Sequence, residues 1–272
     1  MKNDDKIIMT YNRNAKITYK IHDIITLCLT ALESFLKNVY NEISNSISAI
    51  FEFLNELYRK NENYNVSIES DYEILNQHPK LLKACINYIL TLLDFKMYSQ
   101  NALNDEIEIE VINLIHTFTH FEYSFVSSLF KLMTQEEAIK YYKNFVDELT
   151  QSRRDPKKDL NNLHDLANNF KDFSERWHDL EAILEIINEE KLIFKVKKCR
   201  WAENLKDFGS EIGYAMMCHQ DFERAKNFNP NFLLTRNHTL MQGNDYCDFC
   251  YHDTRKNKDL SHPSEKEFKD LG

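Results

Sequence analysis

Apolar side chains recur at steps of three and four residues along the first half of the chain, the spacing that gathers them on one face of a helix. Over residues 18–59 this stripe predicts one very long helix or two helices in series. Its apolar positions are Cys28, Leu32, Phe35, Val39, Ile43, Ile47, Ile50, Leu54 and Tyr58. The periodicity is equally compatible with packing inside the chain and against a second copy, so a homo-oligomer through the N-terminal helices stays open.

Further helical stripes follow. Residues 82–93 come after Pro79, which suits a first helical turn, and residues 105–132 carry the next stripe. A helix over residues 135–149 opens after Thr134, with Glu137 three residues later as in a capping box. Pro156 predicts the start of another helix. Because these apolar faces need one another for burial, residues 1–104 are predicted to form a helical N-terminal region.

The pattern changes after about Trp177. Residues 191–198 alternate apolar and polar side chains as a half-buried strand does, and residues 232–240 and 246–252 are weaker strand candidates. Helices are predicted between them, over residues 201–208 and 210–226. The predicted fold class is therefore α+β, a helical N-terminal region followed by a small antiparallel sheet packed with helices. In this prediction residues 105–255 form the α+β domain and residues 256–272 a charged flexible tail.

Charge and composition restrict the classes of partner that the chain is expected to bind. The net charge of −9 and the pI near 5.6 argue against a nucleic-acid partner, because such a surface needs clustered Lys and Arg. The sequence shows neither a long apolar run nor a signal-peptide pattern, so we expect a cytoplasmic protein with no membrane partner. In a reducing compartment the six cysteines are expected to be core residues, ligands or nucleophiles rather than disulfides.

Chemistry is expected in residues 199–253, which hold four of the six cysteines and three of the four glycines. The first 208 residues contain no glycine, so they cannot easily form the positive-φ turns of phosphate loops and nucleophile elbows. The whole sequence lacks GxSxG, P-loop, Rossmann and HExxH motifs. Serine-elbow hydrolase, nucleotide-binding and zincin interpretations therefore have no support.

Two cysteines in this region are candidate nucleophiles. Cys199 lies where a strand gives way to a helix, and a helix N-terminus stabilises a thiolate. The alternative is a buried thiol that closes the turn. Cys218 and Asp221 lie three residues apart on the following helix and share a face. A helical cysteine is usually a core residue. An aspartate on the same face weakens that interpretation, because a buried carboxylate needs a partner.

A third feature is the CxxC pair of Cys247 and Cys250. With His238 and His252 it supplies enough ligand types for zinc. No second pair at knuckle spacing follows, and in a strand the two cysteines would point to opposite faces. We therefore expect no metal, and a structural zinc site remains a competing hypothesis.

A longer pattern links these residues. It is made of Cys199, Trp201-Ala202-Glu203, Gly209, Cys218, Asp221, Phe228-Asn229-Pro230, Arg236, Thr239, Gly243 and Cys247-Asp248-Phe249. In order and spacing it resembles the L-2-amino-thiazoline-4-carboxylic acid hydrolase family. The resemblance is specific over about residues 180–253, extends loosely to about residue 105 and does not include the first hundred residues. Arg200 and Cys250 depart from it, since proline and arginine are common at those two positions.

The resemblance implies a hydrolase that adds water at C2 of a small-molecule 2-aminothiazoline ring and expels the ring sulfur, giving an N-carbamoyl cysteine. An acid must keep the ring nitrogen protonated, and a thiolate or an activated water must attack C2. The implied catalytic residues are Cys199 as first candidate for the thiolate, Cys218 as second, Asp221 as base or amidinium partner, Cys247 and Asp248. The implied substrate-binding residues are Trp201, Glu203, His219, Arg236, His238 and Thr239, with no cofactor.

A different class of function fits the same sequence. In this second hypothesis the C-terminal region is a non-catalytic small-molecule-binding or sensor module, and the helical region contacts a partner. The N-terminal helices favour it, because they exceed what a small hydrolase needs.

Overall fold

The computed structural model describes residues 6–43, 47–59, 66, 68, 71–96, 100–187 and 189–271. The chain forms two compact units, Lys16–Phe145 and a second that combines Met1–Ala15 with Val146–Gly272. The boundary between them falls inside helix α5 (Gln135–Ser152), so the predicted boundary at residue 105 lies within the first unit. Across the described ranges, no helix is both long and apolar enough to cross a membrane.

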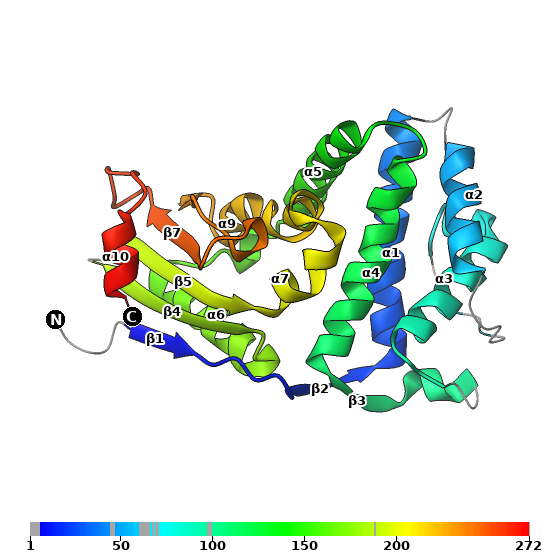
Figure 1. Cartoon of the computed structure of the whole chain (residues 1–272), viewed down its shortest axis with the longest axis horizontal. Coiled ribbons are helices and arrows are strands. Elements are labelled where there is room, and N and C mark those ends of the chain that lie inside the picture. The colour runs from blue at the N-terminus through cyan, green and yellow to red at the C-terminus, as the bar shows by residue number, and fades with distance from the viewer. Residues whose placement is uncertain are drawn as a thin grey trace. The chain divides into compact units, whose positions relative to one another are not determined.

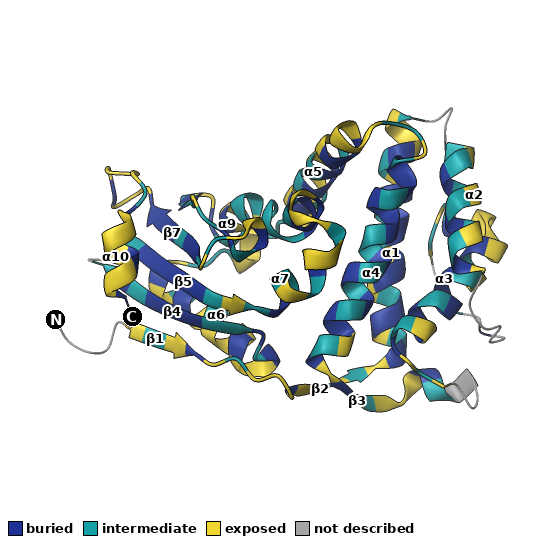
Figure 2. Cartoon of the chain, in the orientation of Figure 1, coloured by how far each residue is buried: buried dark blue, intermediate teal, exposed yellow. Residues whose placement is uncertain are grey.

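The unit Lys16–Phe145 is a helical bundle with a two-stranded antiparallel ribbon. Its elements are β2 (Lys16–Lys20), α1 (Ile21–Glu42), α2 (Ile47–Tyr58), η3 (Leu75–Gln77), α3 (Pro79–Leu92), η4 (Gln100–Asn104), β3 (Glu106–Glu110) and α4 (Val111–Leu129). The long stripe is therefore two helices in series, and it is buried, with Cys28 at 3% exposure and Phe35 at 0%. Figure 2 shows such buried positions running along α1 and α4.

Two local predictions in this unit have clear outcomes. The capping box is confirmed, because the Glu137 carboxylate accepts the backbone N–H of Thr134 and the Thr134 hydroxyl accepts the backbone N–H of Glu137. The helix predicted from residue 105 begins only at Val111, because Glu106–Glu110 pairs with β2 as a strand. Its alternating EIEIE sequence is a strand pattern that the longer helical stripe obscures.

The second unit is built on a five-stranded antiparallel sheet (Figure 1). Its strands are β1 (Lys6–Met9), β4 (Leu180–Ile187), β5 (Lys191–Cys199), β6 (Phe232–Thr235) and β7 (Cys247–Asp253), in the spatial order β1-β4-β5-β7-β6. The α+β fold class is confirmed. The strand predicted over residues 191–198 is present, whereas the one predicted over 232–240 ends at Thr235.

Helices cover both faces of this sheet. The helical elements are η5 (Pro156–Lys158), α6 (Leu163–Trp177), α7 (Arg200–Leu205), η6 (Lys206–Phe208), α8 (Ser210–Gly213), η7 (Tyr214–Cys218), α9 (Asp221–Phe228), η8 (Leu240–Gln242) and α10 (Glu265–Asp270). Leu166 of α6 and Ala225 of α9 pack with Leu192, Phe194 and Val196 on one face. Pro156 opens only a short 3-10 turn, and Asn162 caps α6 by accepting the backbone N–H of Asp165.

The opposite face is covered by the C-terminal residues. Phe268 of α10 and Leu271 are 1% and 3% exposed and pack against Ile183, Ile193 and Cys250. Residues 256–272, predicted as a charged flexible tail, thus contain a packed helix. Ser264 and Glu267 form a capping box at its start, and Phe268 and Leu271 anchor it on the sheet.

Candidate active site

The candidate site is built around Arg236, which directly follows β6. Only 1% of its side chain is exposed, and its Nη1 lies 2.6 Å from Oδ2 of Asp221 at the start of α9. Its Nη2 donates to the Tyr214 hydroxyl over 3.1 Å and to the backbone oxygen of Cys218 over 2.9 Å. These contacts tie the end of β6 to the helical segment that carries Cys218 and Asp221.

Three aromatic rings enclose the Arg236 guanidinium. Its Cζ lies 5.4, 5.0 and 4.9 Å from the ring centroids of Tyr214, Phe222 and Phe249, within the range of cation–π attraction. Burial acts to lower the pKa of Arg236, but Asp221, Tyr214 and Cys218 together raise it overall. Arg236 was predicted to bind the substrate, and both of its terminal nitrogens are already bonded to protein groups.

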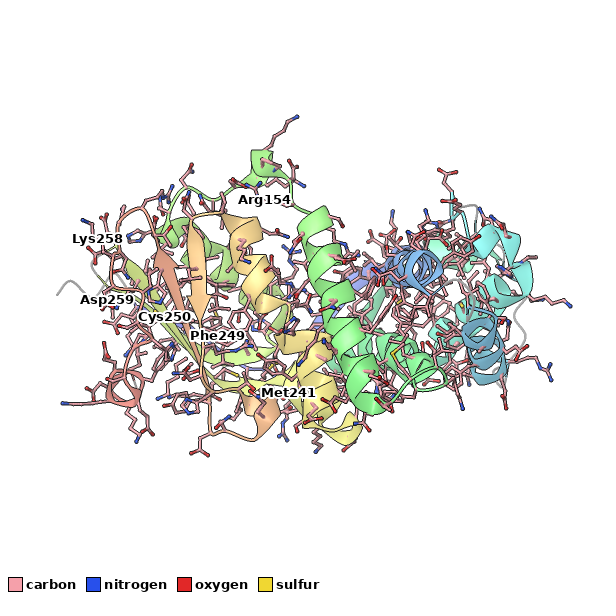
Figure 3. All side chains as sticks on the ribbon, turned by 90° about the horizontal axis from the view of Figure 1, so that it is seen from above. Arg154, Met241, Phe249, Cys250, Lys258 and Asp259 are labelled. Atoms are coloured by element: carbon pink, nitrogen blue, oxygen red, sulfur yellow. The ribbon has the colours of Figure 1, made fainter. Side chains whose placement is uncertain are left out.

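The segment that carries Cys218 is a π-helical turn, η7, between α8 and α9. The backbone N–H of His219 donates to the Tyr214 carbonyl over 2.8 Å, a bond from residue i+5 to residue i. Gly213, just before the turn, packs so closely on Met241, labelled in Figure 3, that a Cβ there would lie 2.5 Å from the Met241 sulfur. π-turns are frequent at functional sites, and this one directs the Cys218 carbonyl toward Arg236.

Three cysteines gather beside the Arg236–Asp221 pair. Cys218 and Cys247 both lie near enough to Cys199 to influence its pKa, and Cys247 also influences the pKa of Cys218. Cys199 and Cys218 are partly exposed, whereas Cys247 is 6% exposed. The fold therefore brings together five of the predicted site residues, from strands β5 and β7, from the residue after β6 and from one helical segment.

Burial raises the pKa of all three thiols. The pKa of Cys247 rises to about 11, although the backbone N–H of Leu240, 3.2 Å from its sulfur, acts in the opposite direction. Burial and then the charge of Asp221 raise the pKa of Cys218, and burial and then Cys247 raise that of Cys199. Burial thus opposes a thiolate at Cys199, although the backbone N–H of Ala202 acts in the opposite direction. Cys199 as the nucleophile stays a prediction.

A second polar cluster surrounds Asp248 on the opposite face of the sheet. Its Oδ1 accepts the backbone N–H groups of Asn237 (2.9 Å) and His238 (2.6 Å), and its Oδ2 lies 2.7 Å from His238 Nδ1 and 3.0 Å from His262 Nε2. Burial acts to raise the pKa of Asp248, but the hydrogen bonds from His262 and His238 lower it overall. Because side chains alternate along β7, Asp248 and Cys247 face opposite sides of the sheet.

The same alternation bears on the zinc hypothesis. Cys247 and Cys250, the latter labelled in Figure 3, belong to packing clusters on different faces. Nε2 of His252 lies 2.9 Å from the Thr235 hydroxyl, and its Nδ1 accepts from the Asn257 side chain over 3.0 Å. In the part of the chain that the structure describes, no group of three or more His, Cys, Asp or Glu is arranged to hold a metal ion. The geometry therefore gives the zinc hypothesis no support.

Comparison with protein families decides the assignment of the chain. Residues 116–251, half of its 272 residues, match the L-2-amino-thiazoline-4-carboxylic acid hydrolase family. This chain belongs to that family. Comparison with curated proteins and with solved structures gave no match. The part shared with the L-2-amino-thiazoline-4-carboxylic acid hydrolase family runs from within α4 into β7, so it contains the whole cysteine cluster and excludes His262 and α10.

Two other predicted substrate-binding residues of this hydrolase-family domain lie on α7. Trp201 Nε1 donates to Oδ2 of Asp179 over 2.8 Å. Glu203 is exposed and accepts the Tyr11 hydroxyl over 2.5 Å. Asp179 is buried, at 1% exposure, and was not predicted, because no local pattern marks an aspartate between a helix and a strand. His262 was missed for a similar reason, since it lies among the charged C-terminal residues.

His219 and Thr239 contact protein groups as well. Nε2 of His219 lies 3.0 Å from Oδ2 of Asp147. The Thr239 hydroxyl accepts the backbone N–H of Gln242 and caps η8, the turn whose first residue donates to the Cys247 sulfur. Thr239 thus bonds to the turn that contacts Cys247.

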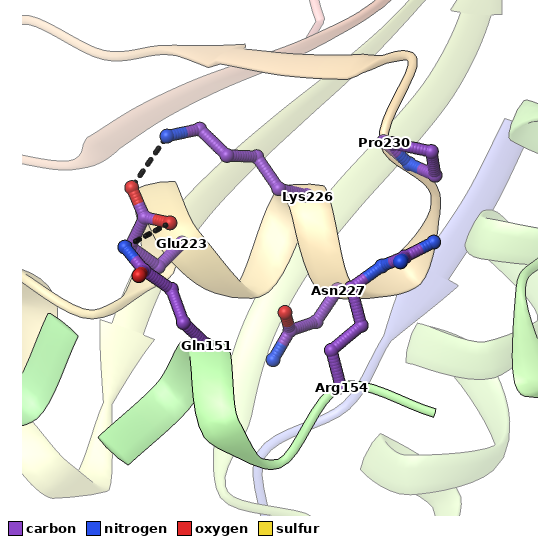
Figure 4. Close-up of a pocket in the computed structure, with 6 residues that line it drawn as sticks. All are labelled: Gln151, Arg154, Glu223, Lys226, Asn227 and Pro230. Carbon is purple, nitrogen blue, oxygen red and sulfur yellow. Dashed lines mark hydrogen bonds and ion pairs between the residues drawn. The ribbon is translucent and has the colours of Figure 1, made fainter. Parts of the chain in front are cut away.

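A surface pocket of about 250 Å³ lies beside α9 (Figure 4). It is lined by Gln151, Arg154, Glu223, Lys226, Asn227 and Pro230. None of these residues was predicted for the site. Glu223 bonds to both Lys226 and Gln151, and Arg154 pairs with Asp159, so the charged side chains of the pocket already have partners in the protein.

Proposed function

We propose that this chain hydrolyses a small cyclic amidine of the L-2-amino-thiazoline-4-carboxylate type at the site of Cys199, Cys218, Cys247, Asp221 and Arg236. The observation that supports the proposal is the position of Asp221 beside Cys218. Arg236 donates to the Asp221 carboxylate and to the Cys218 carbonyl, and the charge of Asp221 raises the pKa of the Cys218 thiol. The Asp221 side chain is 21% exposed, and among the described residues only Arg236 is bonded to it, through Oδ2. Its Oδ1 is therefore available to a substrate.

Opening of a 2-aminothiazoline ring requires an anionic side chain beside the substrate. C2 of a 2-aminothiazoline carries one sulfur and two nitrogens, whose electron donation makes it a weak electrophile. Protonation of the amidine increases its reactivity and gives the ring a positive charge. Asp221 would attract that cation, and the partly buried setting strengthens the attraction.

The position of Asp221 favours one of the cysteines. Because burial raises the pKa of all three thiols, the attacking cysteine needs a base to take its proton near neutral pH. Cys218 is the thiol beside Asp221, three residues away on the same helical segment. This proximity favours Cys218 over Cys199, the first candidate from the sequence.

The proposed reaction has two steps. Cys218 gives its proton to Asp221 and its sulfur bonds to C2, while the bond from C2 to the ring sulfur breaks and the proton passes to that sulfur. Asp221 then takes a proton from a water molecule, whose oxygen bonds to C2 of the enzyme-bound isothiourea. The bond from C2 to Cys218 breaks, Asp221 gives that proton to the Cys218 sulfur, and the second water proton passes to a nitrogen of the carbamoyl group. One water is consumed and one N-carbamoyl cysteine is formed.

The raised thiol pKa values also favour a second candidate function. A site that only binds a small molecule has no need of a reactive thiolate. In that case the domain is a sensor module, and the helical unit Lys16–Phe145 contacts a partner.

The test is incubation of the purified full chain with L-2-amino-thiazoline-4-carboxylate, with N-carbamoyl cysteine measured by mass spectrometry. We expect product from the wild type, and a loss of about 10³-fold or more in rate for Cys218→Ser and for Asp221→Asn. Cys250→Ser is the matched control, since Cys250 is a buried cysteine of β7 on the opposite face. Folded wild type that binds the compound without forming product would refute the hydrolase and favour the sensor module.

A further inference from the structure

Arg200 and Asp179 form a pair of buried charges next to Cys199. Each is 1% exposed, and Arg200 is among the largest fully buried side chains of the described residues. Arg200 Nη2 donates to the Asn12 carbonyl over 2.8 Å, and its Cζ lies 4.8 Å from the centroid of the Tyr11 ring. A guanidinium removed from water to this degree normally has a partner for each N–H.

These two side chains are incompletely bonded. Nε and Nη1 of Arg200 and Oδ1 of Asp179 are buried and have no hydrogen-bond partner. The charges influence each other, yet no ion pair within 4.0 Å joins them. Buried donors and a buried acceptor that remain unpaired destabilise a fold, so such groups call for a specific explanation. Two donors and one acceptor at neighbouring positions are complementary to a ligand that carries an anionic group and an N–H group.

The pair adjoins the proposed active site. Arg200 directly follows Cys199, and Asp179 directly precedes Leu180, the residue opposite Cys199 in the ladder of β4 and β5. The charge of Asp179 also raises the pKa of Cys199. A ligand held by Arg200 and Asp179 would therefore lie against the cysteine cluster.

We propose that Arg200 and Asp179 bind a small zwitterion, whose carboxylate accepts from a free N–H of Arg200 and whose amidinium or ammonium group donates to Asp179 Oδ1. The inference rests on the proposed function, since a 2-aminothiazoline carboxylate is such a zwitterion. It assigns substrate-carboxylate recognition to Arg200, because the terminal nitrogens of Arg236 are bound within the protein.

Access to the pair is through the N-terminal strap, which we define as residues 10–14. Tyr11 and Asn12 cover Arg200, and Asn12 to Asn14 are exposed. The strap is held by the bond from Tyr11 to exposed Glu203 and by the backbone N–H of Asn12, which donates to the His178 carbonyl over 3.1 Å. Few contacts therefore have to break for a ligand to reach Arg200.

The test compares two probes, L-2-amino-thiazoline-4-carboxylate and 2-amino-2-thiazoline, which lacks the carboxylate. Binding is measured by calorimetry on the full chain carrying Cys218→Ala, so that neither probe is consumed. We expect the carboxylate to strengthen binding by about tenfold or more, as a charge-assisted hydrogen bond does. Arg200→Gln should abolish that advantage without weakening 2-amino-2-thiazoline, and Asp179→Asn should weaken both probes.

Two further variants serve as controls for this binding experiment. Arg154→Gln is the matched control, because Arg154 also has a buried Nε without a partner but lies at the pocket of Figure 4, and it should keep the full advantage. Arg200→Lys, which retains the charge, replaces Arg200→Gln if the latter does not fold, and should lose part of the advantage. An advantage unchanged in folded Arg200→Gln, or no binding of either probe to the Cys218→Ala chain, would overturn the inference.

The outcomes separate this inference from the proposed function. Wild-type turnover with an Arg200-independent carboxylate advantage refutes the zwitterion site and leaves the hydrolase. An Arg200-dependent advantage without wild-type turnover refutes the hydrolase and leaves a zwitterion-binding module.

Discussion

Arg236 and Asp221 lie fifteen residues apart in sequence and meet through a 2.6 Å contact between Nη1 and Oδ2. The arginine side chain is 1% exposed and the aspartate side chain 21%. Because both charges are largely withdrawn from water, removal of one leaves the other buried without a partner. The pair thus couples the stability of the domain to the geometry of its candidate site.

Arg236→Leu should lower the free energy of unfolding by about 3–5 kcal/mol. It leaves the Asp221 carboxylate without its partner and removes the guanidinium from between the aromatic rings. Urea denaturation followed by circular dichroism measures the loss. Lys226→Leu is the control, because Lys226 pairs with Glu223 at the surface and should cost about 1 kcal/mol or less. Equal losses for the two variants would show that the buried pair does not stabilise the fold.

Alkylation of the clustered thiols should require alkaline pH. The pKa of Cys247 is about 11, above its ordinary value, so the rate of its reaction with iodoacetamide should keep rising up to about pH 11. Peptide mass mapping after brief labelling gives the rate at each cysteine, and the urea-unfolded chain gives the reference near pH 8.5. One thiol of the folded chain that reacts at pH 7 as fast as free cysteine would contradict the raised pKa values.

The raised pKa of Cys247 also makes the stability of the fold depend on pH. A thiol whose folded pKa is raised stabilises the fold fully below the unfolded pKa, and this contribution is lost as pH rises toward the folded value. For Cys247 the loss should fall between about pH 8.5 and 11. Cys247→Ala should flatten the stability profile in this range, whereas exposed Lys198→Ala should not.

His252 should make the protein acid-sensitive. Burial lowers its pKa from 6.5 to about 4, so the neutral ring stabilises the fold above pH 6.5 and this contribution is lost as pH falls toward 4. The residue is 0% exposed, and the full shift corresponds to about 3 kcal/mol. His252→Gln should lose less stability between pH 6.5 and 4 than the wild type does in urea titrations. His238→Gln serves as the comparison, and an identical pH profile for wild type and His252→Gln would contradict the prediction.

Phe268→Ala should destabilise the second unit by about 3–5 kcal/mol, because it uncovers Ile183, Ile193 and Cys250. Thermal unfolding monitored by circular dichroism measures the change. Lys269→Ala, one residue further on α10 and exposed, should have little effect. A Phe268→Ala chain as stable as the wild type would show that α10 does not pack on the sheet in solution.

Some elements could be predicted because their signal is local. The step of three and four places Leu32, Phe35 and Leu54 on one face, and all three are fully buried. The capping box at Thr134 depends on two residues only. Strand β5 is marked by apolar residues at every second position, Leu192, Phe194 and Val196, although residues 192–196 are all buried. In each case the sequence pattern and the structure follow from neighbours along the chain.

Other elements have no local signal. β4, LEAILEII, is buried on both faces, so its apolar residues do not alternate cleanly. β1 is four residues long and is a strand because it pairs with β4, more than 170 residues away. The bond from His262 to Asp248 joins a charged C-terminal segment to β7. These pairings join residues that are far apart in the sequence, and local periodicity carries no signal for them.

The sequence by itself determined the α+β class, the family, and the residue types of the candidate site, because helical periodicity is a local feature and the pattern from Cys199 to Phe249 can be recognised in the linear sequence. Only the tertiary structure decided that Arg236 binds Asp221 inside the protein, that the three thiols have raised pKa values, and that Asp248 faces away from Cys247. It also decided that Arg200 and Asp179 are buried together. Burial and charge pairing depend on residues brought together from distant parts of the chain, and these set the chemistry that a motif alone leaves open.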